Sequence, residues 1–235
     1  MACEVTALTF SSTDPERLAG FWGGLLAADV TTDRGALALV AVPDVGFALR
    51  FAAGAGEKWG RNQMHPDLSP ASVREQESAV RRALELGGRR IDVGQGPDAE
   101  HVVLADPDDN ELCVLEPGGD FLAGCPFFSS LAGDGLAHVG YFWRDALAFD
   151  LVWDVDGETA VQSPTGGPKI TWGGEPVAPK LGTNRLHLDV APAAHSSIDA
   201  QVERLLALGA TRVDALCPDG LGMADPGGNE FCVVG

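Results

Sequence analysis

The chain contains NQMHPDLSPASVREQESAVRRALELGGRRID at residues 62–92 and NRLHLDVAPAAHSSIDAQVERLLALGATRVD at residues 184–214. Both stretches begin with Asn-x-x-His-x-Asp and end an amphipathic segment with Leu-Gly-Gly or Leu-Gly-Ala. Each is followed by a second shared block, which is VVLADPDDNELCVL at 102–115 and LGMADPGGNEFCVV at 221–234. Self-similarity on this scale indicates a duplicated structural unit.

A weaker repeat precedes each of these stretches. LAGFWGGLLAADVTTD at 18–33 aligns with VGYFWRDALAFDLVWD at 139–154, with Phe-Trp matched to Phe-Trp. The chain is therefore predicted to hold four modules in the order A, B, A′, B′. We expect a first domain at 1–118 (modules 1–55 and 56–118), a linker at 119–124, and a second domain at 125–235 (modules 125–176 and 177–235). The linker lies in EPGGDFLAG, a stretch rich in Gly and Pro.

Each module has the same order of patterns. Leu186, Leu188 and Val190 alternate with polar residues, which is strand periodicity, and a helical pattern follows that ends at Gly209. Short strands are expected near 211–216, 220–225 and 229–234. Module A gives the same order, with a strand at 4–10, a helix at 14–26 and strands near 29–32, 36–41 and 46–52. The predicted fold class is α+β, built from four βαβββ modules.

The net charge, the apolar runs and the cysteine content argue against several classes of function. The formal charge of −18 argues against a nucleic-acid or anionic-membrane partner, because both need basic patches. The longest apolar runs are too short to span a bilayer, and the N-terminus lacks the character of a secretory signal. Five scattered cysteines favour a reduced, cytoplasmic protein. A monomer or homodimer with a small-molecule partner is expected.

The duplicated βαβββ order, with each half ending in Asp-Pro-x-x-Asn-Glu-Phe/Leu-Cys-Val, resembles the vicinal oxygen chelate superfamily. This superfamily includes glyoxalases, bleomycin-resistance proteins and dioxygenases. The motif Lys-x-Gly-x-Asn-x-x-His-x-Asp, at Lys58–Asp67 and Lys180–Asp189, is similar to its glyoxalase-like subgroup. The resemblance implies sheets that curl into half-open cups, with the helices outside and a ligand or metal inside.

The resemblance also implies metal ligands on the first and last strands of each module. His65 with Glu111, and His187 with Glu230, match that set in modules B and B′. In the A-type modules, Ala7 and Phe128 align with the first-strand position, and Ala48 and Lys169 align with the last-strand position. None of these four supplies a ligand, and a catalytic zinc site usually has three protein ligands. Neither A-type module adds a ligand, so the count stays at two whichever B-type module it pairs with. No cofactor is therefore expected, and a divalent metal is the less favoured alternative.

Strand alternation also assigns further residues to the cups. His187 is expected to face its cup with Arg185 and Asp189, as His65 does with Gln63 and Asp67. On the last strands, Cys113 and Leu115 are expected there in the first domain, and Cys232 and Val234 in the second. The remaining candidate ligand-binding residues are Arg50, in the first cup, and Lys169, in the second. Buried thiols acting as small apolar groups are the commoner role for such cysteines.

Three functions remain open. The first is a pocket that binds a small organic molecule without a complete metal site, for which bleomycin-resistance-type proteins are the precedent. The second is an isomerase, lyase or hydrolase that uses His65 and Glu111, or His187 and Glu230, for proton transfer. In a purely structural alternative, these histidines and glutamates only bond to each other and to the turns. The third function is a metal-dependent glyoxalase or dioxygenase.

Overall fold

The computed structural model describes residues 2–33, 37–42, 44–54, 56–96, 99, 101–194, 196–214, 217 and 220–235. Each module has one strand, one helix and three further strands. The first module holds β1 Cys3–Ser12, α1 Pro15–Leu26, β2 Val30–Asp33, β3 Leu37–Ala41 and β4 Ala48–Ala53. The second holds β5 Met64–Leu68, α2 Val73–Glu85, β6 Arg89–Arg90, β7 Val102–Ala105 and β8 Glu111–Val114. The third holds β9 Phe128–Gly133, α3 Ala137–Leu147, β10 Asp150–Val155, β11 Glu158–Gln162 and β12 Lys169–Trp172. The fourth holds β13 Leu186–Pro192, α4 Ile198–Ala207, β14 Thr211–Arg212, β15 Gly220–Ala224 and β16 Glu230–Val234.

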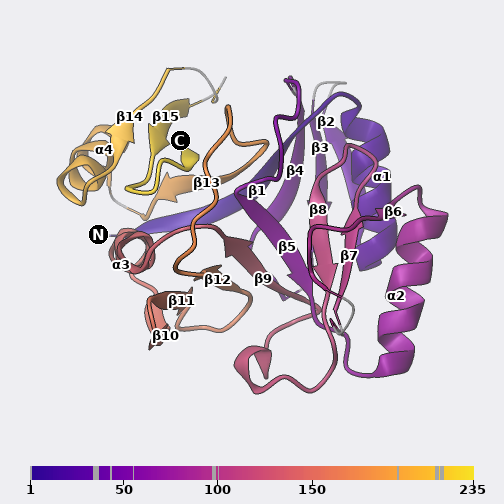
Figure 1. Ribbon diagram of the computed structural model, residues 1–235. Helices are drawn as coiled ribbons and strands as arrows, with labels where there is room; N and C mark the ends of the chain where they lie inside the picture. The colour runs from indigo at the N-terminus through magenta and orange to yellow at the C-terminus, as the bar shows by residue number, and fades with distance from the viewer. Residues whose placement is uncertain are drawn as a thin grey trace.

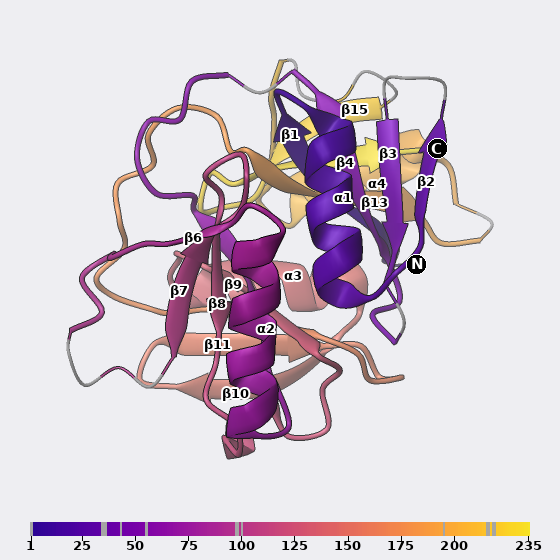
Figure 2. The ribbon, with the colours of Figure 1, turned by 90° about the vertical axis from the view of Figure 1, so that its right-hand side faces the viewer.

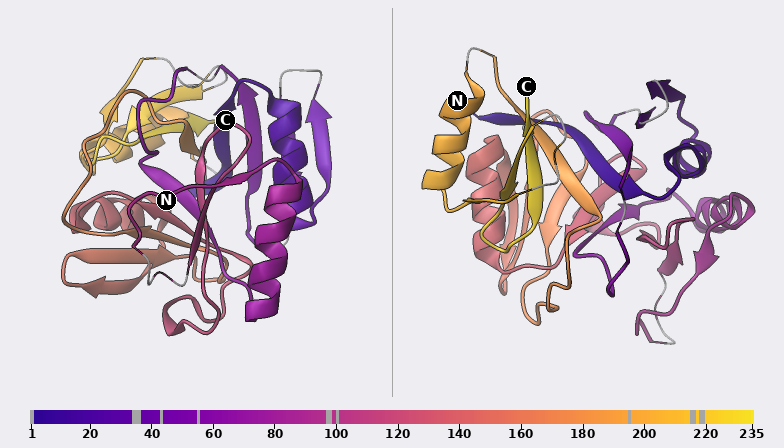
Figure 3. Two further views of the ribbon diagram at one scale, coloured as in Figure 1. Left: turned by 45° about the vertical axis from the view of Figure 1, so that its right-hand side comes forward. Right: turned by 90° about the horizontal axis from the view of Figure 1, so that it is seen from above.

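The modules pair into two eight-stranded sheets, and each sheet takes one module from each half of the chain. Sheet A has the order β14-β15-β16-β13-β1-β4-β3-β2, so the first and last modules form it. Sheet B has the order β10-β11-β12-β9-β5-β8-β7-β6 and is formed by the two middle modules. The joins are antiparallel, β1 with β13 and β5 with β9. Figures 1 and 3 show the indigo strand β1 running beside the orange strand β13 from the other end of the chain.

In the described residues, four α-helices cover one face of each sheet, and a short 3-10 helix, η1 Asp120–Leu122, lies in the linker. Contacts place α1 on β3 and β4, α2 on β8, α3 on β11 and β12, and α4 on β13 and β16. Helices α1 and α2 lie side by side although they belong to different sheets (Figure 2). Arg204 of α4 donates to the carbonyl oxygens of Asp145 and Ala146 at 2.9 and 2.6 Å, which joins α4 to the end of α3.

Local sequence explains where the helices begin. Asp14 accepts a hydrogen bond from the backbone N–H of Arg17, and Pro15 occupies the first helical turn of α1. Ser72 and Ser197 cap α2 and α4 in the same way. The apolar side of β1, with Leu8 and Phe10, is fully buried in the core. Within the described residues, no helix is long and apolar enough to cross a membrane.

The α+β fold with four βαβββ modules is confirmed. The predicted strands 36–41 and 211–216 include residues 36 and 215–216, which lie outside the described residues. One alignment is wrong. Ala7 of β1 pairs with Asp189, and the residue that pairs with the equivalent Asp67 is Ser130, not Phe128. Phe128 is 1% exposed and packs in the core, because a register shift separates it from Ser130.

Two buried hydrogen bonds tie modules of the same half together across the sheets. The indole Nε1 of Trp22 in α1 donates to Asp106 Oδ2 at 3.2 Å, and that of Trp143 in α3 donates to Asp225 Oδ2 at 3.0 Å. Each Asp begins its Asp-Pro-x-x-Asn turn, where its other oxygen accepts from the backbone N–H of Asn110 or Asn229. The motif is therefore a turn, as its composition predicts, and it also binds a neighbouring helix.

The buried Asp106 makes stability depend on pH. Burial raises the pKa of its carboxyl from 3.8 to about 6, against hydrogen bonds that lower it. The folded chain holds the proton of Asp106 more tightly than the unfolded chain does. The stabilisation that the protonated carboxyl provides is therefore complete below pH 3.8 and is lost as pH rises to about 6. We expect the free energy of unfolding to fall by up to about 3 kcal/mol over this range relative to Asp106→Asn. Urea unfolding of both proteins at pH 4, 5, 6 and 7 measures the difference, and parallel pH profiles would contradict it.

Candidate functional site

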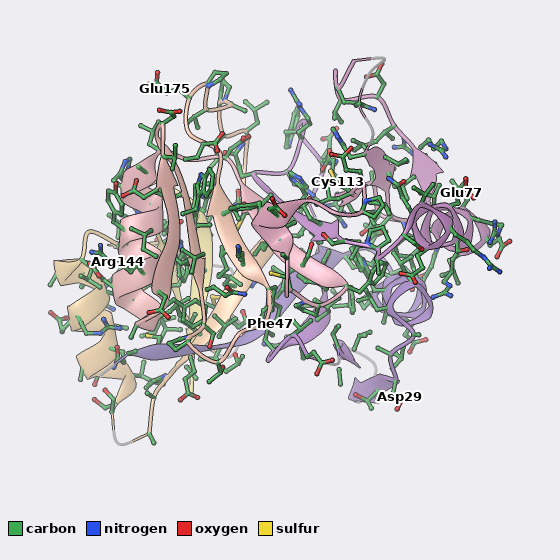
Figure 4. All side chains as sticks on the ribbon, turned by 90° about the horizontal axis from the view of Figure 1, so that it is seen from below. Asp29, Phe47, Glu77, Cys113, Arg144 and Glu175 are labelled. Atoms are coloured by element: carbon green, nitrogen blue, oxygen red, sulfur yellow. A yellow bond between two sulfur atoms is a disulfide. The ribbon has the colours of Figure 1, made fainter. Side chains whose placement is uncertain are left out.

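The face of sheet B that is turned away from its helices, here called the cup of sheet B, carries one row of side chains across four paired strands. The register places Lys169 opposite Ser130, Ser130 opposite Asp67, and Asp67 opposite Cys113. His65 lies two residues before Asp67 on β5, so it shares that face. The prediction that alternation sends His65, Asp67 and Cys113 to one face is confirmed by their contacts. Figure 4 shows Cys113 in the interior, whereas Glu77 lies on the outer side of α2.

His65, Asp67 and Cys113 form a compact polar cluster. His65 Nε2 lies 3.4 Å from Asp67 Oδ1, and Ser130 Oγ donates to Asp67 Oδ2 at 2.6 Å. Burial alone would lower the pKa of His65, but interactions with Asp67 and Cys113 outweigh it and hold that pKa well above its usual range. The side chain of His65 is 34% exposed, so the cluster is accessible from solvent.

Sheet A repeats this arrangement in a closed form. His187 Nε2 lies 3.4 Å from Asp189 Oδ1, but the two side chains are only 3% and 2% exposed. Thr9 Oγ1 and Arg50 Nη1 donate to Asp189 Oδ2 at 2.7 and 3.1 Å. Burial raises the pKa of Asp189, but the contact with His187, followed by the bonds from Thr9 and Arg50, outweighs it and holds that pKa below its usual value. The predictions that Arg50 lies in the first cup and Lys169 in the second are wrong, because each sheet takes a module from each half of the chain. Arg50 lies in sheet A with Asp189, and Lys169 lies in sheet B in one row with Asp67.

The expectation that all cysteines are reduced is wrong for one pair. Cys232, at the position equivalent to Cys113, forms a disulfide with Cys217. Cys3, Cys113 and Cys125 are free. The cup of sheet A, the face of that sheet turned away from its helices, therefore lacks the free thiol that alternation predicts for Cys232. No sequence signal points to the pairing, because Cys217 has no counterpart in module B.

Glu111 and Glu230 bind the loop that precedes the first strand of their own modules. Glu111 Oε1 is 2.5 Å from Lys58 Nζ, and its Oε2 accepts from the backbone N–H of Asn62 at 3.2 Å. Glu230 makes the same contacts with Lys180 and Asn184, at 2.5 and 3.2 Å. In the described part of the chain, no hydrogen bond or ion pair joins either Glu to its His. In both modules, the Lys and Asn of the Lys-x-Gly-x-Asn motif engage the Glu that the resemblance implies as a ligand.

The other candidate residues are placed around these clusters. Arg185 Nη2 lies 3.9 Å from Asp108 of the neighbouring turn instead of contacting Asp189. The backbone carbonyl of Gln63 accepts from the N–H of Asp134, just before β5 begins. Lys169 donates to the carbonyl oxygen of Phe121, and its Nζ lies 4.5 Å from the centre of the Phe121 ring. Lys169 thus holds the linker against sheet B.

A cavity of about 680 Å³ opens at the end of the cup of sheet B. Its lining includes Ser69, His101 and Leu115. Ser69 and Leu115 lie two residues after Asp67 and Cys113, and His101 lies two residues before Val103, which pairs with Cys113. Alternation puts them on the same face, about 7 Å further along the sheet. Linker residues 118–123 form the opposite wall. The sequence marks this segment only as a linker, since its composition carries no signal of a pocket wall.

The comparisons with known proteins agree with this architecture. The family model described as "Glyoxalase-like domain" matches the chain twice, at residues 7–115 and 131–234. The chain belongs to this family. The two matches correspond to the two halves that the repeat marks in the sequence. No curated protein matches the chain in a sequence comparison.

Solved structures show the same fold at low identity. The chain is similar to glyoxalase I from Zea mays, with a TM-score of 0.65 and 12% identity over 99% of this chain and 92% of that one. A mutant of the same maize protein gives 0.67 and 13% over the same shares. A putative dioxygenase from Bacillus subtilis gives 0.61 and 11%, covering 97% of this chain and 84% of that one. At these identities the likeness concerns the fold alone.

Proposed function

We propose that this glyoxalase-like protein binds a small organic molecule in the cup of sheet B. The observation that carries the proposal is the cavity of about 680 Å³ on the same face as His65, Asp67 and Cys113. Its volume lies within the range of ordinary ligand pockets, about 300–1,000 Å³. Leu115 and Phe121 offer apolar walls, and Ser69 and His101 offer polar groups in the lining, so an apolar body with one oxygen-bearing group fits the site.

The cup of sheet A is proposed to be scaffold. Arg50 and Thr9 occupy the oxygen of Asp189 that corresponds to the one Ser130 holds in sheet B, and the histidine beside it is 3% exposed. A ligand there would have to displace a buried ion pair, which is costly. In this proposal the cup of sheet B binds the ligand, and the cup of sheet A has only a structural role.

Filling the cavity is expected to weaken ligand binding at least about tenfold, equivalent to about 1.4 kcal/mol. Leu115→Trp places a large ring on the cavity wall, while Val234→Trp makes the same change at the equivalent end of β16 in sheet A. A panel of small carboxylic acids and ketones, screened by saturation-transfer NMR in buffer with EDTA, supplies the probe, and calorimetry gives its Kd. Equal affinities for the unaltered protein and Leu115→Trp, or equal losses in both variants, would contradict the proposal.

Proton transfer by His65 is a second candidate function, favoured by the pairing of its imidazole with Asp67 in an accessible cup. Glu111, the partner that the sequence suggests, is held by Lys58 instead. Loss of turnover in His65→Ala, with turnover kept in His187→Ala, would separate this enzyme from a protein that only binds.

A further inference from the structure

The donor atoms of His65, Asp67 and Cys113 converge on one point of the cup of sheet B. One imidazole nitrogen, one carboxylate oxygen and the thiol sulfur all lie within 4.8 Å of one another. Sheet register produces this convergence, because Asp67 and Cys113 are opposite each other on parallel strands and His65 is the next residue on that face of β5. Imidazole, carboxylate and thiolate are the three ligand types that zinc accepts in proteins.

The surroundings keep one oxygen of Asp67 directed at this point. Ser130 Oγ donates to Oδ2 at 2.6 Å, which fixes the carboxylate and leaves Oδ1 on the side of His65. Hydrogen bonds of this kind orient metal ligands in known sites. The sheet position equivalent to Arg50 is Thr171, so the competing guanidinium of sheet A has no counterpart at that position.

Sheet A supplies a natural comparison. His187, Asp189 and Cys232 bring the same three atom types within 4.8 Å. There, however, the sulfur of Cys232 is bonded to Cys217, and Arg50 binds Asp189. A disulfide sulfur has no thiolate to offer, and the guanidinium repels a cation. The same fold thus carries one open and one closed version of the cluster.

We propose that His65, Asp67 and Cys113 bind one divalent transition-metal ion of the zinc class, with the Cys113 thiol giving up its proton to solvent. This set differs from the His/Glu set that the resemblance implies, since Glu111 is occupied by Lys58. Three protein ligands leave a coordination position for water or for an oxygen of a bound molecule. The inference deepens the proposed function, because the ion lies in the same cup as the cavity.

Cobalt(II) is the probe that tests the site, because a thiolate ligand gives it a near-ultraviolet charge-transfer band. Protein without an affinity tag is freed of metal with EDTA, exchanged into metal-free buffer and titrated with cobalt, while zinc binding is followed by calorimetry. We expect one equivalent to bind with the charge-transfer band present. His65→Ala and Asp67→Asn should each weaken binding about 10- to 100-fold or more, and Cys113→Ser should remove the band.

His187→Ala is the matched control, since it makes the His65→Ala change in the closed cluster, and it should leave the stoichiometry and the band unchanged. Circular dichroism without metal confirms that each variant is folded, and His65→Ala, at a half-exposed position, keeps the test valid if Cys113→Ser unfolds. Absence of the band, or binding that survives both His65→Ala and Cys113→Ser, would overturn the proposal. Organic-ligand binding measured in EDTA tests the proposed function separately, so the failure of one is distinguishable from the failure of the other.

Discussion

Separated at the linker, residues 1–118 and 125–235 are each expected to lose both eight-stranded sheets and to fail to form a folded monomer. Each half holds one module of sheet A and one of sheet B, so neither half contains a complete sheet. In the first half alone, β1 and β5 would lose their partners β13 and β9 and expose long unpaired edges. We expect an equimolar mixture to recover a one-to-one complex with native circular dichroism, measured together with light scattering on a sizing column.

The control is the intact protein with a protease site inserted in the linker at 119–124 and cleaved after folding. Its two fragments should stay together, because the sheet joins and not the linker hold them. A monomeric fragment 1–118 with native circular dichroism and a cooperative thermal transition would contradict the prediction. It would instead support the division of the chain into two independent domains at the linker, which the repeat by itself suggests.

The repeat and the strand alternation predict the elements well, for a physical reason. Alternation of Leu186, Leu188 and Val190 with polar residues reports a local property, burial of one face against a helix. The pairing of β1 with β13, in contrast, joins residues that are nearly the whole chain apart. An A-type module can pair with the B-type module of its own half or of the other half, and the local sequence pattern is the same in both cases. The register shift that puts Ser130 in place of Phe128 is likewise invisible in the alternation alone.

The candidate site divides in the same way. Alternation places Asp67 and Cys113 on the face of His65, but their convergence depends on the register of β5 with β8. Lys58 belongs to the motif that suggests the family, yet only the folded loop shows that its ammonium group occupies Glu111. The cavity wall and the disulfide of Cys217 come from segments whose composition carries no signal of them.

Asp106→Ala is expected to lower the free energy of unfolding by about 3–5 kcal/mol, because several buried donors lose their acceptor at about 1–3 kcal/mol each. These donors are the indole of Trp22 and the backbone N–H groups of Asp108 and Asn110. Urea unfolding at pH 7 measures the loss. Asp109→Asn removes an exposed ion pair with Arg89 from the same turn and keeps a residue that tolerates the left-handed backbone of that position, so it should cost less than about 1 kcal/mol.

The matched change Asp225→Ala should cost a similar amount, since Trp143 and the turn at 225–229 make the same bonds. The sheets join modules from opposite halves, whereas the Trp–Asp bonds join modules within one half, so every module is tied to two others. Loosening either tie therefore weakens both sheets, and each variant should unfold in one transition at lower urea. Two separate transitions, with only one of them shifted, would show instead that the sheets unfold independently and that the Trp–Asp bonds do not couple them.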